Sequence, residues 1–263
     1  MVAPRLVAEL NASLPGAVRR ADTLLHGARE ERLPTGFAEL DAALDGGLPR
    51  GHLSELVAHG SAGATSLVQR LLGRLTAQAH VAAWVDAPDA FDPASASAAG
   101  IDLERLLWVR PPDLATALAA TEALLTMGGF PLVLLDAAAA PRGASARMDV
   151  PRRAGLPGRA APAGSRVAGA LHAWIRLARA AARSRSALLV LQHAPHRTAA
   201  GRDGQPAGAG SAAAVRLEIE PLRVVWDRAD GAPSLLDGLV AQVVVRRNRG
   251  GDGSERRILL EVA

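Results

Sequence analysis

Apolar residues form short, almost continuous runs along the chain from residue 34 onward. Several of these runs have no alternating polar face, which is typical of strands that helices cover on both sides of a sheet. Turn residues and polar residues separate the runs. The predicted strands cover residues 52–57, 81–86, 106–110, 132–136, 187–192, 215–219, 222–226, 239–246 and 257–262.

Between the early strands, apolar positions recur at helical spacing. Residues 66–79 are predicted to form a helix, and residues 115–127 and 167–183 have the same character. One face of the first helix contains positions 67, 68, 71, 72, 75 and 79. Strands that alternate with helices predict an α/β fold with a mostly parallel sheet sandwiched by helices. The last four strands follow one another without helices, which predicts an antiparallel extension at one edge.

Three segments do not fit this alternation. Residues 1–33 predict two short helical stretches broken at Pro15-Gly16, and we interpret them as an amino-terminal helical arm before a core domain of residues 34–263. Residues 141–166 and 194–214 are rich in Gly, Pro, Ala and Arg and predict long loops. Each loop follows a buried strand, so each leaves the sheet at its carboxyl end, where open α/β sheets bind ligands.

The composition excludes several kinds of chemistry. The chain has no cysteine, which rules out disulfides and thiolate metal sites and fits a cytoplasmic protein. No apolar run reaches the roughly 18–20 residues of a membrane span, and the first residues lack the pattern of a secretory signal. The histidines show no HExxH spacing, and we interpret His193 and His196 as loop residues rather than metal ligands. We therefore expect no metal site.

All 30 basic residues are arginine, and their distribution is uneven. Between residues 141 and 186 there are ten arginines and one acid, Asp149. This local charge favours an anionic partner such as single-stranded DNA, although a solvated basic loop would have the same pattern. Neither long loop contains an aromatic residue for base stacking, so we expect DNA binding to be weak and sensitive to salt. The DNA-binding candidates are Arg142, Arg147, Arg152, Arg153, Arg159, Arg166, Arg197 and Arg202.

The stretch AHGSAGAT, residues 58–65, lies between a predicted strand and a predicted helix. A phosphate loop has this position and the pattern G-x-x-x-x-G-K-[ST], in which backbone amides hold phosphate oxygens and the lysine neutralises their charge. Gly63 and Thr65 fit the pattern, whereas Ala58 and Ala64 replace the first glycine and the lysine. Asp136 ends a later buried strand and would supply the metal-binding acid. The candidate residues of this degenerate site are Gly60, Gly63, Thr65, Ser66 and Asp136.

The sequences around this stretch resemble RecA-type recombinases, in order, over about residues 34–262. The matching segments are LPTGFAELDAALDGGLPRGHLSEL (33–56), WVDAPDAFDPASASAAGIDLERLLWVRPPD (84–113), LVLLDAAAAP (132–141), AGAGSAAAVRLEIE (207–220) and VVVRRNRG (243–250). The resemblance implies a RecA-like P-loop NTPase core without the carboxy-terminal domain of RecA. Within this superfamily, LPTGFAELDAAL and AGIDLERLLWVRPP are most similar to ImuA, the RecA-like accessory proteins of bacterial mutagenic translesion synthesis.

The departures from RecA concern the ATPase chemistry. RecA-type ATPases have a water-orienting glutamate where this chain has Pro88, with Asp89 next to it. Loss of one charged catalytic group in phosphoryl transfer costs roughly 10³–10⁵ in rate. We therefore expect no ATP hydrolysis and no ATP or Mg²⁺ cofactor, while residual nucleotide binding through Gly63 and Thr65 stays open. The resemblance also places Arg246, Arg247 and Arg249 on a strand that faces the nucleotide of a neighbouring subunit.

These observations favour a non-catalytic RecA-like accessory protein of the SOS response to DNA damage, acting in translesion synthesis. The implied partners are RecA, an ImuB-type Y-family polymerase homologue, an error-prone polymerase and, weakly, single-stranded DNA, with no membrane involved. The arm either docks on a neighbouring RecA-like subunit or packs on its own core. One alternative is a divergent RecA-type ATP-dependent DNA-binding protein. Another is a SulA-like cell division inhibitor, against which the long RecA-like motifs argue.

Overall fold

The computed structural model describes residues 31–137, 163–194, 212–227, 235–250 and 254–262. The chain divides into two compact units, Met1–Glu31 and Arg32–Ala263. Apart from Glu31, the described residues belong to the second unit, which we call the core unit. No helix within the described part of the chain is long and apolar enough to cross a membrane.

The centre of the core unit is an eight-stranded sheet with the order β10-β9-β8-β3-β7-β6-β4-β5. The strands from β8 to β5 in this order pair in parallel, whereas β8, β9 and β10 pair antiparallel at one edge. The α/β fold with an antiparallel extension is therefore confirmed. The strands are β3 (Leu53–His59), β4 (Ala82–Asp86), β5 (Leu106–Val109), β6 (Leu132–Asp136), β7 (Ala187–Ala194), β8 (Val215–Asp227), β9 (Leu235–Asn248) and β10 (Arg256–Val262).

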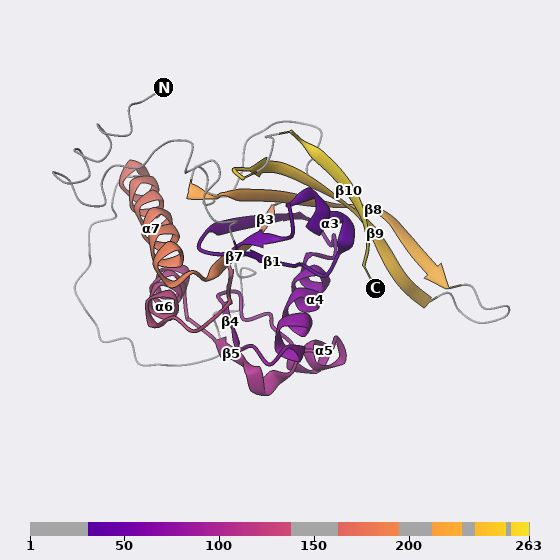
Figure 1. Cartoon of the computed structure of the whole chain (residues 1–263), viewed down its shortest axis with the longest axis horizontal. Helices are drawn as coiled ribbons and strands as arrows, with labels where there is room; N and C mark the ends of the chain where they lie inside the picture. The colour runs from indigo at the N-terminus through magenta and orange to yellow at the C-terminus, as the bar shows by residue number, and fades with distance from the viewer. Residues whose placement is uncertain (1–30, 138–162, 195–211, 228–234, 251–253, 263) are drawn as a thin grey trace, which may run out of the picture. The chain divides into compact units, whose positions relative to one another are not determined.

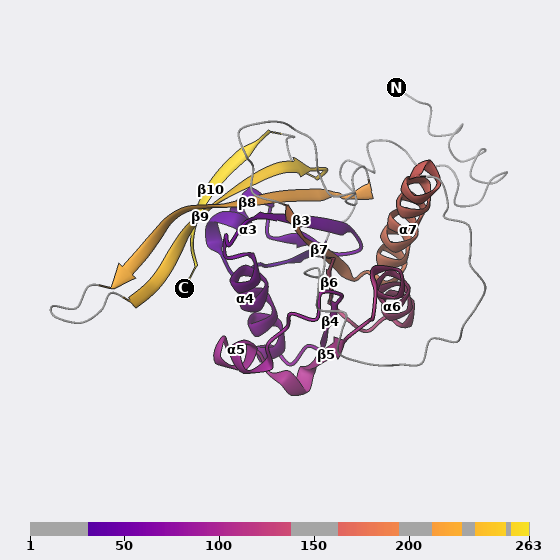
Figure 2. The ribbon, with the colours of Figure 1, turned by 180° about the vertical axis from the view of Figure 1, so that it is seen from behind.

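Helices cover both faces of the parallel part of the sheet (Figures 1 and 2). Helices α6 and α7 lie on one side of it, and α3, α4 and α5 lie on the other. A separate core cluster of apolar side chains fills each side. The described helices are α3 (Ala38–Ala43), α4 (Ala64–Ala77), α5 (Pro93–Ala98), the 3-10 turn η1 (Leu103–Arg105), α6 (Leu114–Met127) and α7 (Ala163–Ser184).

Helix α4 shows how the apolar pattern produces this layer. Its predicted face is buried through Leu67, Leu71 and Leu75, which pack in one core cluster with apolar side chains of β3 and β7. Burial of each leucine contributes about 1.5–3 kcal/mol. The prediction was wrong at one position, because Ala79 lies beyond the end of the helix and is exposed, with φ +62°.

The TGFAELD motif before the first long strand has a structural role. Thr35 is buried, and its backbone N and Oγ1 donate hydrogen bonds of 2.6 and 2.7 Å to Asp41 in α3. Two-residue strands β1 (Arg32–Leu33) and β2 (Leu48–Pro49) then pair antiparallel. Arg32 and Leu33, which the sequence placed in the arm, thus belong to the core unit. Gly47 permits this pairing, because a Cβ there would lie 2.2 Å from the Leu33 carbonyl oxygen.

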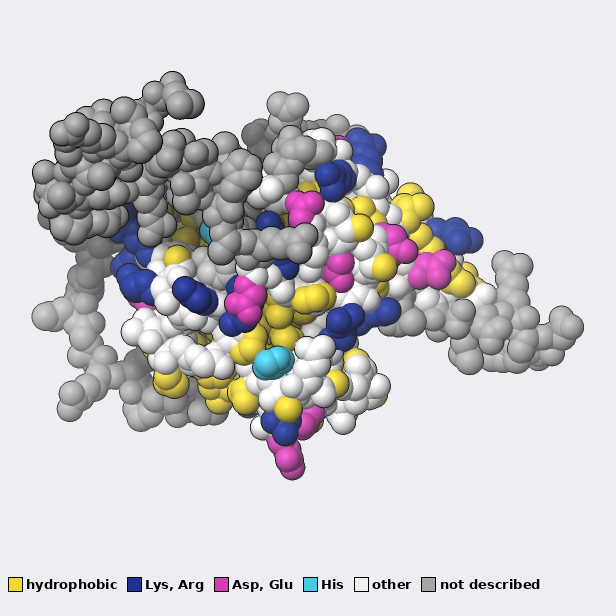
Figure 3. All heavy atoms as spheres, in the orientation of Figure 1, with side chains coloured by type: hydrophobic (Ala, Val, Ile, Leu, Met, Phe, Trp, Pro, Cys, Tyr) yellow, Lys and Arg dark blue, Asp and Glu magenta, His cyan; other side chains and the backbone are white. Residues whose placement is uncertain are grey.

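The prediction of two strands at 215–219 and 222–226 was wrong, because β8 is continuous across both. Pro221 breaks the apolar pattern, and the pairing of β8 with β9 shifts register between Pro221 and Arg223. A proline lacks the donor for a ladder hydrogen bond, and a bulge accommodates it without ending the strand. The outer parts of β8 and β9 project past the rest of the sheet (Figure 1). Apolar and charged side chains are interspersed along them (Figure 3), and Trp226 is 52% exposed.

Candidate functional site

The loop of residues 60–63 connects the end of β3 to the start of α4. Gly60 has φ +66° and Gly63, the residue that caps α4, has φ +79°. This left-handed region favours glycine, so both glycines suit the strand-to-helix turn for steric reasons alone. The backbone N of Ala62 donates to the Gly60 carbonyl oxygen at 3.0 Å and tightens the turn.

A hollow of about 510 Å³ opens at this loop. The first turn of α4 has no side-chain cap and no acidic residue. The backbone N–H groups at a helix N-terminus favour an anion, since their partial positive charges add up there. The hollow can therefore receive a small anionic group. Its lining residues are Gly60, Ser61, Ala62, Gly63, Ala64, Thr65, His193 and Ala194.

Ala64 is at the position that the sequence predicts for the cation of a phosphate loop. Its methyl group is buried, only 3% exposed, and packs in the core cluster beneath α4. Apart from His193, no lining residue has an ionisable side chain. Among these lining residues, backbone dipoles are thus the main source of positive potential for an anion in the hollow.

Asp136 lies at the carboxyl end of β6. Strands β3, β7 and β6 are consecutive and parallel in the sheet, so the loop, His193 and Asp136 all lie at the same edge. Asp136 is 5% exposed and does not line the hollow. Thr65 is exposed and lines it, whereas Ser66 is half-buried on α4 and does not. The structure brings together Gly60, Gly63 and Thr65, and it places Asp136 at the same sheet edge.

The segment after β4, where a RecA-type ATPase has its glutamate, is fixed by a buried carboxylate. Asp86 is fully buried and accepts hydrogen bonds from the backbone N of Ala90 at 3.0 Å and of Phe91 at 2.9 Å. It also accepts a bond from Trp108 Nε1 at 3.2 Å. The Phe91 ring packs between Trp84 and Trp108, with centroid distances of 4.7 and 5.1 Å. Asp86 therefore has a structural role that its position alone did not reveal.

Within this segment Pro88 is buried, and the neighbouring Asp89 is exposed with φ +56°. Both carboxylate oxygens of Asp89 contact the Arg110 guanidinium, at 2.6 and 2.8 Å. The same guanidinium lies over the Trp108 ring, 4.8 Å from its centroid. The acid beside the glutamate position is thus engaged in an ion pair at the end of β5.

The ion pair between Asp89 and Arg110 should have a measurable effect on the titration of Asp89. Hydrogen bonds from Arg110, aided by its charge, hold the pKa of Asp89 below its ordinary value. The pKa of Asp89 is lower in the folded state than in the unfolded state. The ion pair therefore stabilises the folded state at pH values above the ordinary aspartate pKa. The contribution is lost as pH falls through the lowered pKa. We expect Arg110→Gln to raise the pKa of Asp89 in a carboxyl NMR titration, whereas Arg105→Gln leaves it unchanged. An ordinary aspartate pKa in the unaltered protein would contradict this.

The three arginines predicted to face a neighbouring subunit, Arg246, Arg247 and Arg249, differ in their surroundings. Arg246 donates to Glu218 at 2.9 Å and to Glu255 at 2.5 Å, so it is engaged in ion pairs within the chain. Arg247 and Arg249 are exposed, and Arg247 Nη1 donates to the Ala213 carbonyl oxygen at 3.4 Å. That all three arginines face a neighbouring nucleotide stays a prediction, and for Arg246 the guanidinium also bridges two carboxylates of this chain.

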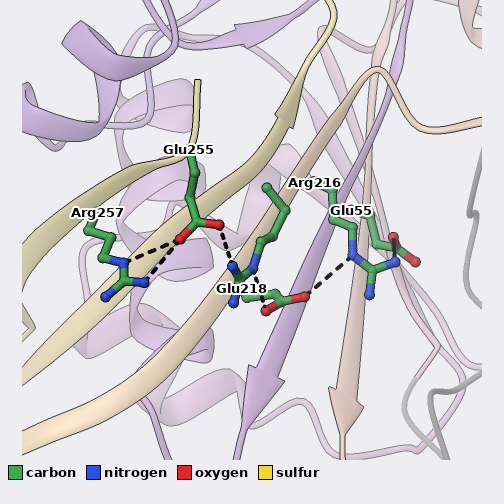
Figure 4. Close-up of polar contacts among 6 residues, drawn as sticks. Glu55, Arg216, Glu218, Glu255 and Arg257 are labelled. Carbon is green, nitrogen blue, oxygen red and sulfur yellow. Dashed lines mark hydrogen bonds and ion pairs between the residues drawn. The ribbon is translucent and has the colours of Figure 1, made fainter. Parts of the chain in front are cut away.

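Arg246 is part of a row of alternating charges that runs from β3 across β8 and β9 to β10; Figure 4 labels the other five members. Glu55 on β3 is fully buried and accepts from Arg216 on β8 at 2.9 Å. At the other end, Arg257 on β10 contacts Glu255 at 3.2 Å. We call this set the charge row; its members are Glu55, Arg216, Glu218, Arg246, Glu255 and Arg257.

Most DNA-binding candidates lie outside the described residues. These are Arg142, Arg147, Arg152, Arg153, Arg159, Arg197 and Arg202. Arg166 was predicted to end a loop, but α7 begins at Ala163, so Arg166 lies within the helix; its side chain is not described.

Two features were missed by the sequence analysis. His193, interpreted as a loop residue, is on β7 and lines the hollow. The signal that could have located it is the unbroken apolar run before it, which predicts a strand reaching the sheet edge. The charge row joins residues as far apart as 161 positions, and no local pattern indicates such pairs.

Comparison with known proteins gives consistent results. The family model of the RecA N-terminal domain matches residues 22–202. Protein RecA of Symbiobacterium thermophilum is 36% identical over 126 residues, which are 48% of this chain and 36% of that protein. Protein RecA of Herpetosiphon aurantiacus is 38% identical over 111 residues, 42% of this chain and 31% of that protein. The match thus spans about a third of these relatives. The crystal structure of the RadB recombinase superposes with a TM-score of 0.57 at 19% identity, covering 86% of this chain and 94% of that one.

Proposed function

Because the chain belongs to the RecA family, we propose that it is a RecA-like accessory protein of the bacterial DNA damage response that does not hydrolyse ATP. It acts through contacts with other proteins, and its degenerate nucleotide site has no catalytic role. The fold would serve as a rigid support for these contacts.

The observation that carries this proposal is the phosphate loop itself. The position of its cation is taken by Ala64, a buried methyl group, and the chain contains no lysine that could replace it. The acid next to the missing glutamate, Asp89, is paired with Arg110. Neutralising the phosphate charge and orienting the attacking water are the two tasks that phosphoryl transfer needs most, and these residues do neither.

The resemblance of LPTGFAELDAAL and AGIDLERLLWVRPP to ImuA supports a role in mutagenic translesion synthesis. On this proposal the partners are RecA, an ImuB-type Y-family polymerase homologue and an error-prone polymerase. The arginines of the long loops would add weak contacts with single-stranded DNA. A protein that has kept the family's sheet but lost its phosphate cation is suited to regulate such an assembly by binding.

Affinity capture of the tagged full chain after DNA damage tests the proposal. We expect RecA or a translesion polymerase component to be recovered, with less recovery from undamaged cells and none on the tag alone. The variant Asp136→Asn is the matched control. Since the proposed role needs no hydrolysis, this bait should capture as much partner as the unaltered chain. Recovery of neither class of protein, or recovery lost in Asp136→Asn, would count against the proposal.

A further inference from the structure

A histidine and two glutamates meet where β3 and β8 end side by side, outside the hollow. His59 is the last residue of β3, and Glu218 and Glu220 lie on β8. The strands are parallel, with Val57 opposite Glu218 and Ala58 opposite Ile219. His59 and Glu220 are the next residues along the two strands. One side-chain oxygen or nitrogen from each of the three residues lies within 4.8 Å of the others.

The His59 ring is buried at both nitrogens, and neither nitrogen has a hydrogen-bond partner among the described residues. A buried imidazole without a partner is unusual, because its polar atoms lose their hydration and gain nothing in exchange. One of these nitrogens lies within 4.8 Å of a carboxylate oxygen from each glutamate, without a hydrogen bond to either. An ion bound between the three groups would give the His59 ring the partner that it lacks.

We propose that His59, Glu218 and Glu220 form a binding site for a divalent transition-metal ion, with Zn²⁺ as the best match. Zn²⁺ binds imidazole nitrogen and carboxylate oxygen at about 2.0–2.2 Å, so tetrahedral ligand atoms lie about 3.4 Å apart. The three ligand atoms lie within 4.8 Å of one another, so they would move closer together on binding the ion. Mg²⁺ and Ca²⁺ prefer ligands that are all oxygen, so the histidine favours a transition metal.

The charge row positions one ligand of this site. Glu218 Oε2 accepts from Arg246 Nε at 2.9 Å, whereas Oε1 is 3.7 Å from Arg216 Nε, beyond hydrogen-bond distance. Oε1 makes the longer of these two contacts, so it is the oxygen that we expect to bind the metal. Ion pairs behind a ligating carboxylate fix its orientation, as hydrogen-bonded partners do in known metal sites. Three protein ligands leave a fourth position for water or for a group from a partner.

The bound ion would connect the end of β3 to β8 one residue before Gly60. It would therefore hold the start of the candidate nucleotide loop against the antiparallel part of the sheet. This inference goes beyond the proposed function and does not depend on it, because metal binding can be measured without RecA, a polymerase or DNA.

Equilibrium dialysis of the full chain, freed of any histidine tag, against Zn²⁺ tests the site by metal analysis. We expect one Zn²⁺ per chain and a higher Tm in its presence. His59→Gln and Glu220→Gln should each lower the affinity by about 100-fold, since each removes one of three ligands. The matched controls are His80→Gln and Glu261→Gln, which change exposed residues elsewhere and should bind Zn²⁺ as the unaltered chain does.

Circular dichroism shows whether each ligand variant folds. If one of the two does not, the other still tests the site. Co²⁺ gives a second measurement, because its visible absorption depends on the ligands and should be lost in both variants. No stoichiometric Zn²⁺ binding by the unaltered chain would overturn the inference. The inference would also be overturned if a folded ligand variant bound Zn²⁺ as tightly as the unaltered chain does. An equal loss of Zn²⁺ affinity in the control variants would overturn it too.

Discussion

Arg216→Met is expected to lower the free energy of unfolding by about 3–5 kcal/mol. The guanidinium of Arg216 contacts the Glu55 carboxylate at 2.9 Å, and the Glu55 side chain is fully buried on a central strand. Removal of Arg216 takes the cation of this ion pair away from a negative charge that stays buried in the sheet. A buried charge that loses its paired cation is costly because the protein interior replaces little of the hydration that the charge has lost. Urea unfolding should show a lower midpoint with an unchanged slope.

The double variant Glu55→Gln/Arg216→Met separates this cause from lost packing. It removes both charges, so much of the lost stability should return. Arg257→Met, at the exposed end of the same charge row, should cost no more than about 1 kcal/mol, as expected of a surface pair. Equal losses for Arg216→Met and Arg257→Met would show that burial of Glu55 does not determine the energetics of the row.

The sequence predicted much of the sheet, because buried strands have a strong local signal. The run LVLLD became β6 with its predicted bounds, and the apolar face of α4 was right from Leu67 to Leu75. The sequence predicted two strands in place of β8, because Pro221 is a local signal for the end of a strand. Pairing with β9 overrides that signal, and a register shift absorbs the missing donor.

The candidate site was predicted less completely, since its contacts join distant segments. The loop at Gly60–Gly63 and the position of Asp136 follow from motif and strand order. The ion pair between Asp89 and Arg110 does not, because it requires the parallel pairing of β4 with β5. The same holds for His59, whose carboxylate neighbours are some 160 positions away in the sequence and become adjacent only when β8 pairs with β3.

The second prediction with a large expected effect concerns the rate of ATP hydrolysis. RecA-type ATPases use a loop lysine and a glutamate, and loss of one charged group costs roughly 10³–10⁵ in rate. The sequence resemblance puts Ala64 and Pro88 at these positions, so we expect no turnover even with single-stranded DNA. Ala64→Lys alone should not restore hydrolysis, because the carboxylate next to the predicted glutamate position, Asp89, stays paired with Arg110 and does not orient water.

The central claim, that this RecA-family chain works without ATP hydrolysis, is tested most directly by phosphate release. The purified chain is incubated with ATP, Mg²⁺ and single-stranded DNA, beside its Asp136→Asn variant and a RecA-type ATPase as positive control. The account predicts the same background rate for the chain and its variant. Phosphate release well above background that Asp136→Asn abolishes would contradict it and favour a divergent ATPase.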